Sequence, residues 1–129
     1  FAIPKVHKYL TSENIRDEVV VMASGGIRSA YDIAKAIALG ADGVILGTAE
    51  LVALSCTRCS NCERGRGCPF GLTTTDPELS LLVDPEVAAQ RIGNMYESFA
   101  WQLRDILRRL GLKNIRELRG RTDLLVYGK

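Results

Sequence analysis

The 129-residue sequence has no long hydrophobic run, little net charge and no cysteine outside one short stretch. Its apolar segments are shorter than the roughly 18 residues that a membrane-spanning helix needs, so we expect no membrane partner. The formal net charge is only +2, which argues against a nucleic-acid partner. The first residues lack the basic and apolar regions of a signal peptide, so we expect a cytoplasmic protein.

The four cysteines follow the spacing C-x2-C-x2-C-x5-C-P, in which the final proline is Pro69. They are Cys56, Cys59, Cys62 and Cys68. Cysteines this close in the chain can direct several thiolates at one small object, and the bacterial ferredoxin run C-x2-C-x2-C-x3-C-P is similar. Gly65 and Gly67 would allow sharp turns in the last gap. The spacing therefore predicts an iron–sulfur cluster.

Zinc and disulfides are the alternative uses of these cysteines. Structural zinc sites usually have two C-x2-C pairs about a dozen or more residues apart. The widest gap here is five residues. Cysteines crowded into so short a stretch also suit crossed disulfides poorly. The spacing thus favours a cluster, with zinc as the next alternative.

Two strand–turn–helix repeats precede the cysteines. The apolar run over 18–23 is typical of a strand buried on both faces. A helix is expected over 30–39, with Ser29 as its N-cap and Asp32 completing a capping box. A second buried strand is expected over 43–46 and a short helix over 49–54. Repeats of this length build α/β folds with parallel strands.

Small residues follow each expected strand at its carboxyl end. They are Ser24, Gly25 and Gly26 after the first strand, and Gly47 and Thr48 after the second. Such residues let backbone N–H groups approach an anion, and α/β folds bind ligands at this end of their strands. In (β/α)8 barrels the loops after strands seven and eight often bind phosphate. The turns therefore predict a phosphate site, although they could simply be tight turns.

Helices are expected on both sides of this region. A short one over 4–14 begins with an N-terminal proline, and a long amphipathic one over 85–110 follows Asp84, which would be its N-cap. The segment 70–76 reads as a loop, and 114–118 as one or two further helical turns.

Four segments together resemble a known family. They are Ser24-Gly25-Gly26-Ile27-Arg28, residues 43–49, the cysteine loop with Cys68-Pro69 and the Thr-Thr-Asp-Pro that follows, and Gly120 to Leu125. In this order they are similar to the C-terminal part of the FMN-binding synthase domain of glutamate synthase, especially the archaeal type. The resemblance implies the last βα units of a (β/α)8 TIM barrel over 1–55, an iron–sulfur loop over 56–77 and a C-terminal helical extension over 78–129.

The resemblance also implies an activity and partners. Members of this family join ammonia, released from glutamine by a glutaminase subunit or domain, to 2-oxoglutarate, and reduced FMN converts the imine to glutamate. An oxidoreductase of this kind needs the remainder of the barrel and an electron donor such as ferredoxin or a pyridine-nucleotide reductase. Its catalytic residues would lie upstream, so none is assigned in this chain.

By the same resemblance, Ser24, Gly25 and Gly26 would lie near the FMN phosphate after strand seven, and Gly47 and Thr48 after strand eight. The family's familiar cluster is [3Fe-4S], held by cysteines spaced x5 and x4.

Three cysteines of this chain match that spacing if one residue is inserted in the second gap: Cys56, Cys62 and Cys68. Cys59 is an additional cysteine that the family's spacing does not include. Four thiolates can complete a [4Fe-4S] cluster, which we favour, with [3Fe-4S] possible. The alternatives are an inosine-monophosphate-dehydrogenase-like barrel enzyme, an N-methylglutamate synthase subunit, or a non-enzymatic zinc-binding assembly module.

Overall fold

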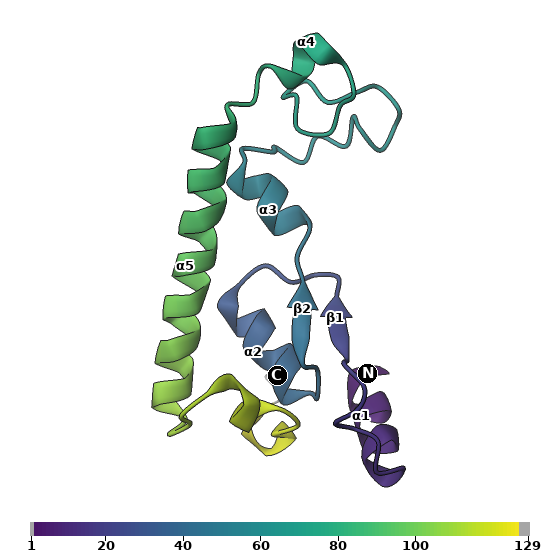
Figure 1. Cartoon of the computed structure of the whole chain (residues 1–129), viewed down its shortest axis with the longest axis vertical. Coiled ribbons are helices and arrows are strands. Elements are labelled where there is room, and N and C mark those ends of the chain that lie inside the picture. Colours follow the sequence, from purple (N-terminus) through teal and green to yellow (C-terminus); the bar gives the residue numbers. More distant parts are fainter. Residues whose placement is uncertain (1, 127–129) are drawn as a thin grey trace. The chain divides into compact units, whose positions relative to one another are not determined.

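The computed structural model describes residues 2–126 and divides into two compact units (Figure 1). The first unit consists of residues 1–46 and 99–129, and the second of residues 47–98. The helices and strands are α1 (Ala2–Ser12), β1 (Met22–Ser24), α2 (Ala30–Ala38), β2 (Gly43–Ile45), α3 (Thr48–Ala53), α4 (Pro77–Ser80), α5 (Pro85–Arg109), and the 3-10 turns η1 (Ile115–Leu118) and η2 (Thr122–Leu124).

The first unit contains a two-stranded parallel sheet. β1 pairs with β2 in a register that places Ala23 opposite Val44 and Ser24 opposite Ile45. This confirms the predicted parallel α/β character. The described residues supply no third strand, so this part of the chain is a small mixed α/β unit that is compatible with a piece of a barrel.

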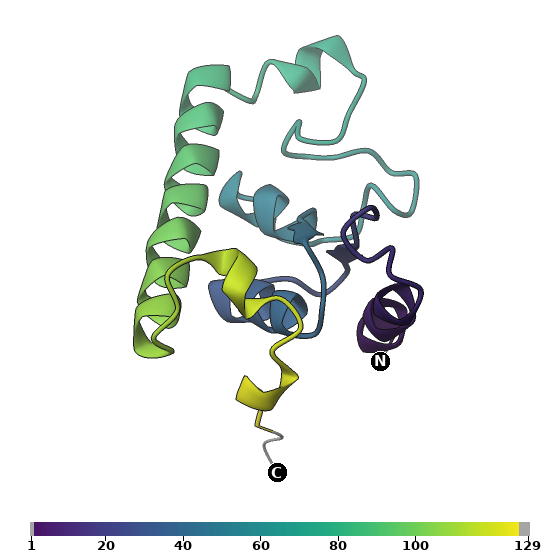
Figure 2. The same ribbon diagram turned by 60° about the horizontal axis from the view of Figure 1, so that its bottom comes forward.

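Helix α2 provides much of the core of the first unit. A capping box starts the helix, because the Ser29 side chain accepts the Asp32 N–H while the Asp32 carboxylate accepts the Ser29 N–H, as the sequence predicts. Ile33 and Ile37 then face Leu107 and Leu118 from the C-terminal part of the unit. Figure 2 shows α2 beside the C-terminal segment that contains η1. Residues from both ends of the chain therefore share one core.

The first strand is shorter and more exposed than the sequence suggested. β1 contains only three residues, and in the run that was expected to be buried on both faces Val20 is 74% exposed and Met22 48% exposed. Side chains hold the backbone before the strand: the Val21 N–H donates to Asp42 and the Val19 carbonyl accepts from Arg16. Only Ala23 of the strand is buried, so the prediction of burial on both faces is wrong for this chain.

The long helix is close to its predicted bounds, since α5 ends at Arg109 and Asp84 caps its start by accepting the N–H groups of Glu86 and Val87. Helix α1 begins and ends two residues before the expected range of 4–14.

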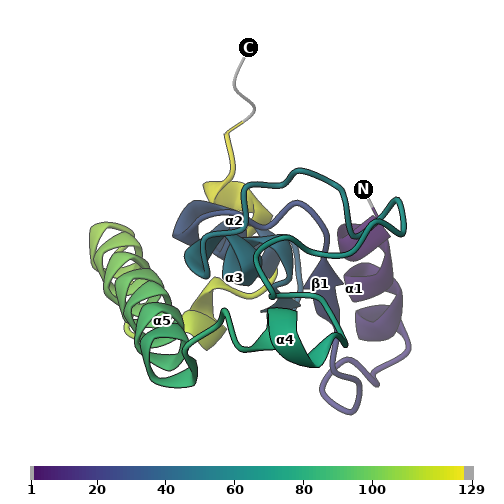
Figure 3. The same cartoon turned by 90° about the horizontal axis from the view of Figure 1, so that it is seen from above.

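The second unit contains α3, α4 and the first part of α5. Between α3 and α4 the chain runs through the cysteine segment without a helix or strand (Figure 3). Helix α4 was not expected from the sequence; Asp76 caps it by accepting the N–H groups of Glu78 and Leu79. The predicted division at 55 and 77 stays a prediction. None of the helices over residues 2–126 is long and apolar enough to cross a membrane.

Candidate functional site

The first glycine turn leaves β1 at the edge of the sheet where Ser24 pairs with Ile45. Gly25 and Gly26 have φ values of +91° and +71°, which non-glycine residues rarely adopt. A Cβ at either position would meet no atom within 4 Å, so packing does not require glycine there. The turn is exposed and needs glycine for its backbone conformation, so a ligand can reach its backbone N–H groups.

The N-terminus of α2 is not free to bind an anion. The Asp32 carboxylate accepts the N–H groups of Arg28 and Ser29, at 3.1 and 3.0 Å. The pKa of Asp32 lies below its ordinary value, chiefly because the Ser29 hydroxyl donates a hydrogen bond to this carboxylate. The positive end of the α2 helix dipole is therefore already occupied by the carboxylate of Asp32. The backbone N–H groups of Gly25 and Gly26 are the better contact for an anion in this turn.

The second glycine turn belongs to the second unit. Gly47 is the N-cap of α3, no side chain caps this end among the described residues, and a Cβ at Gly47 would enter open space. Thr48 is the first residue of the helix and is exposed. Gly47 and Thr48 follow Ile45 closely in the chain, so each strand leads into an open turn.

The first cysteine follows a well-defined helix end. The Ser55 N–H donates to the Val52 carbonyl and the Cys56 N–H to the Leu51 carbonyl, both at 2.9 Å. These two bonds form the Schellman arrangement that ends many helices. The sulfur of Cys56 accepts the Arg58 N–H at 3.4 Å. Cys56 is therefore held in place by α3 and by its own loop.

The last cysteine is also held by the backbone around it. Cys68 is 7% exposed, and its carbonyl accepts the Gly71 N–H in a turn that contains Pro69. The N–H groups of Thr73 and Phe70 donate to its sulfur and, against the opposing effect of burial, lower the pKa of the thiol to about 7. Such bonds favour the thiolate, which is the form that ligates metals.

The structure does not bring all four cysteines together. Cys59 and Cys62 are exposed, Cys56 is half-buried, and all four thiols are free. Over the described residues, no three histidine, cysteine, aspartate or glutamate side chains are placed to hold one metal ion. The donor set nevertheless fits an iron–sulfur cluster, because it is made of thiols alone and two of the sulfurs accept backbone N–H groups.

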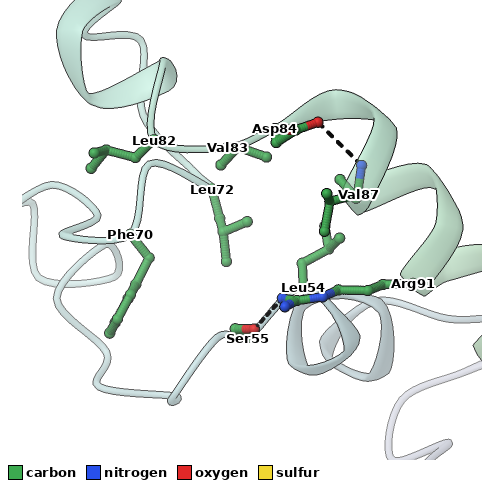
Figure 4. A pocket seen from close by; sticks show the side chains of 10 residues that line it. Leu54, Ser55, Phe70, Leu72, Leu82, Val83, Asp84, Val87 and Arg91 are labelled. Carbon is green, nitrogen blue, oxygen red and sulfur yellow. Dashed lines mark hydrogen bonds between the residues drawn. The ribbon is translucent and has the colours of Figure 1, made fainter.

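A cavity of about 260 Å³ adjoins the cysteine loop within the second unit (Figure 4). Leu54, Leu72 and Val87 give it an apolar lining. The Arg91 side chain extends along α5 and donates to the Ser55 hydroxyl at 2.6 Å. Neither Arg91 nor Ser55 was expected from the sequence to contribute to a site. One sequence signal could have indicated this contact: the helix end directly before the first cysteine has a serine where glycine is usual.

A second contact joins α3 to α5 in this unit. The Tyr96 hydroxyl donates to the Glu50 carboxylate. This bond raises the pKa of Tyr96, because the neighbouring carboxylate disfavours a second negative charge. With the bond between Arg91 and Ser55, α3 is tied to α5 at two places.

Comparison with known proteins identifies the family. A family described as a conserved region in glutamate synthase matches residues 1–113. The chain belongs to the glutamate synthase family. It is 44% identical to the archaeal glutamate synthase [NADPH] of Methanocaldococcus jannaschii over 96% of this chain and 24% of that protein. The archaeal-type glutamate synthase [NADPH] of Thermotoga neapolitana is 42% identical over 97% of the chain and 24% of its own length.

More distant members of the glutamate synthase family match as well. The large chain of glutamate synthase [NADPH] from Azospirillum brasilense is 34% identical over 95% of this chain and 8% of its own length. The chain thus spans about a quarter of the archaeal-type relatives and a smaller share of the large chain. The resemblance stated from the motifs is confirmed.

Proposed function

We propose that the chain is the C-terminal part of the FMN-binding synthase domain of a glutamate synthase. The enzyme would be an oxidoreductase that forms glutamate from 2-oxoglutarate and glutamine-derived ammonia. The observation that carries this proposal is the 44% identity to an archaeal glutamate synthase along 96% of the chain. The parallel pairing of β1 and β2 supports the further proposal that these strands belong to a (β/α)8 TIM barrel.

FMN would be held through its phosphate by Ser24, Gly25, Gly26, Gly47 and Thr48. The open backbone at the two glycine turns supports this, since a phosphate needs N–H groups that no side chain covers. FMN would supply the electrons that reduce the imine to the amine. The residues of this chain would bind and orient the cofactor, while the catalytic residues would lie in other parts of the protein.

The cysteine loop would hold an iron–sulfur cluster through Cys56, Cys59, Cys62 and Cys68, with [4Fe-4S] favoured over [3Fe-4S]. Such a cluster would supply one-electron transfer. Cys56 and Cys68 already have N–H donors on sulfur, whereas Cys59 and Cys62 are exposed. The loop would therefore have to close around the cluster when it binds.

Several partners follow from this function. The rest of the barrel would come from the other three-quarters of the protein, as the length of the relatives suggests. Ammonia would come from a glutaminase subunit or domain, and electrons from a ferredoxin or a pyridine-nucleotide reductase. The names of the archaeal-type relatives specify NADPH, which favours the pyridine nucleotide as the source of electrons. Free thiols at all four cysteines suit a cytoplasmic location.

Cofactor analysis tests this proposal. The full-length protein would be purified anaerobically and assayed for iron, acid-labile sulfide, zinc and FMN. About four irons and four sulfides per chain support the [4Fe-4S] assignment, and about three irons support [3Fe-4S] with Cys59 as a bystander. One zinc without sulfide would contradict the cluster and favour a zinc-binding assembly module.

Activity provides the second test. With a suitable reductant, the full-length enzyme should form glutamate only when both 2-oxoglutarate and a nitrogen source are present. Glutamate formation without bound flavin would contradict the assignment of FMN. Inosine-monophosphate oxidation by NAD would instead support the alternative barrel enzyme, although the family match disfavours it.

A further inference from the structure

Ser55 has a backbone conformation that serine seldom adopts. Its φ is +75°, and it occupies the position after α3 where a Schellman motif usually has glycine. A Cβ in this left-handed region costs free energy that glycine would avoid. A residue held in a disfavoured conformation suggests that its side chain has a role.

The Ser55 side chain has one partner that can account for this. The Nη1 of Arg91 donates to the Ser55 Oγ at 2.6 Å, from a helix position 36 residues further along the chain (Figure 4). Glycine would relieve the backbone but would remove this bond. Across residues 2–126, no carboxylate forms an ion pair with Arg91. The bond to Ser55 is therefore made by an arginine whose charge is otherwise unpaired.

This contact lies next to the first cysteine in the chain. Ser55 immediately precedes Cys56, and the Cys56 N–H is bonded to the Leu51 carbonyl at 2.9 Å. α3 fixes Cys56 from one side, and Arg91 fixes the preceding residue from α5. A displacement of Ser55 would rotate the Cys56 backbone and redirect its sulfur, because the two residues share a peptide plane.

We propose that Arg91 is a positioning residue for the iron–sulfur site. It acts through Ser55 to hold Cys56 where it ligates the cluster, and it places an unpaired positive charge near the first ligand. This inference rests on the proposed cluster function. A positive charge near an anionic cluster stabilises its reduced form, so Arg91 also raises the reduction potential.

Matched substitutions in the full-length, cluster-loaded protein test the inference. Ser55→Ala keeps a Cβ at positive φ but removes the hydroxyl, and Arg91→Gln removes the charge. Ser60→Ala is the control for the serine, since Ser60 also has positive φ, at +58°, and is not bonded to Arg91. Arg104→Gln is the control for the arginine, because Arg104 is also exposed on α5.

The first measurement is the rate of iron release to a chelator. Loss of one hydrogen bond should accelerate release about fivefold in Ser55→Ala and in Arg91→Gln. The double variant should release iron no faster than Arg91→Gln, since both substitutions remove the same bond. The second measurement is the midpoint potential, which should fall in Arg91→Gln and stay unchanged in Arg104→Gln.

Each contrary result has a distinct meaning. Iron release and potentials at wild-type values in both test variants would overturn the positioning role while leaving the cluster in place. Equal acceleration in Ser60→Ala would also overturn it, because loop flexibility would then explain the effect. A wild-type protein without iron and sulfide would refute the proposed cluster, and the inference with it. Circular dichroism of each variant establishes that the fold is retained.

Discussion

Arg16 and Asp42 form an ion pair, with 2.8 Å between the Nη2 of the arginine and the Oδ2 of the carboxylate. Arg16 is only 6% exposed, and its other N–H groups donate to the Nδ1 of His7 and to backbone carbonyls that include that of Gly40. Arg119 binds the second oxygen of Asp42 at 2.7 Å. One carboxylate in the α2–β2 turn thus connects the segment between α1 and β1 with the C-terminal segment.

Replacement of Asp42 should destabilise the first unit strongly. Asp42→Asn would leave the guanidinium of Arg16 buried without a counter-charge, and an unpaired buried charge costs about 3 kcal/mol. Urea unfolding of the full-length protein would measure this loss. The control is Asp105→Asn, which removes the ion pairs to the exposed Arg108 and Arg109 and should change stability little. Equal effects of the two substitutions would contradict the argument.

Stability should fall in acid because of Asp42. Burial alone would raise the pKa of this carboxyl, but N–H bonds from Val21 and from the two arginines prevail and lower it from 3.8 to about 2. A carboxylate with a depressed folded-state pKa stabilises the fold above its unfolded pKa, and this stabilisation is lost as pH falls from 3.8 toward 2. The contribution is at most about 2 kcal/mol. Unfolding midpoints of wild type and Asp42→Asn should converge in this window.

His7 should add a second step at higher pH. Burial, together with the charge of Arg16, lowers the pKa of His7 below its ordinary 6.5, and its Nδ1 accepts the Arg16 Nε–H at 2.9 Å. Arg119 lowers this pKa further and Asp42 opposes the change. A histidine with a lowered pKa stabilises the fold above 6.5, and the stabilisation is lost as pH falls through the folded pKa. His7→Gln should flatten the dependence of melting temperature on pH below 6.5, and an unchanged slope would contradict this.

The sequence predicted the elements that depend on local signals. The capping box of Ser29 and Asp32, the cap at Asp84 and the two parallel strands are all present. Each is encoded by a few neighbouring residues or by a short apolar run, which is why local sequence patterns suffice to predict it.

The sequence could not predict contacts between distant residues. The pairing of Arg16 with Asp42 joins positions 26 residues apart, and that of Arg119 with Asp42 joins positions 77 apart. The contact between His7 and Arg16 joins positions nine residues apart. The exposure of Met22 could not be predicted either. An apolar strand has the same sequence pattern whether or not another element covers it in the structure.

Gly26 offers a test of the FMN phosphate site. Gly26 and Gly111 both have a φ of +71°, and a Cβ at either would meet no atom within 4 Å. Gly26→Ala and Gly111→Ala should therefore cost similar stability, about 1 kcal/mol each. Only Gly26→Ala should weaken FMN binding, by about tenfold, because the methyl group would keep the phosphate from backbone N–H groups. Fluorescence titration of the apoprotein with FMN would measure this, and equal FMN affinity in the two variants would argue against the site.

Gly71 should be the most sensitive glycine of the cysteine loop. Its N–H donates to the Cys68 carbonyl, and a Cβ at Gly71 would overlap the backbone oxygen of Leu79 in α4. Gly67 has a similar φ, +76° against +72°, but open space around it. Gly71→Ala must therefore move α4 or the turn that holds Cys68, whereas Gly67→Ala carries only the strain of its conformation.

The consequence for the cluster separates the two substitutions. Gly71→Ala should lower the iron content of the full-length protein and expose the loop to limited proteolysis, because the buried cysteine loses its fixed position. Gly67→Ala should retain most of its iron. If the two variants keep equal iron, the turn at Cys68 is not needed to place that ligand, and the contribution of α4 to the site is only structural.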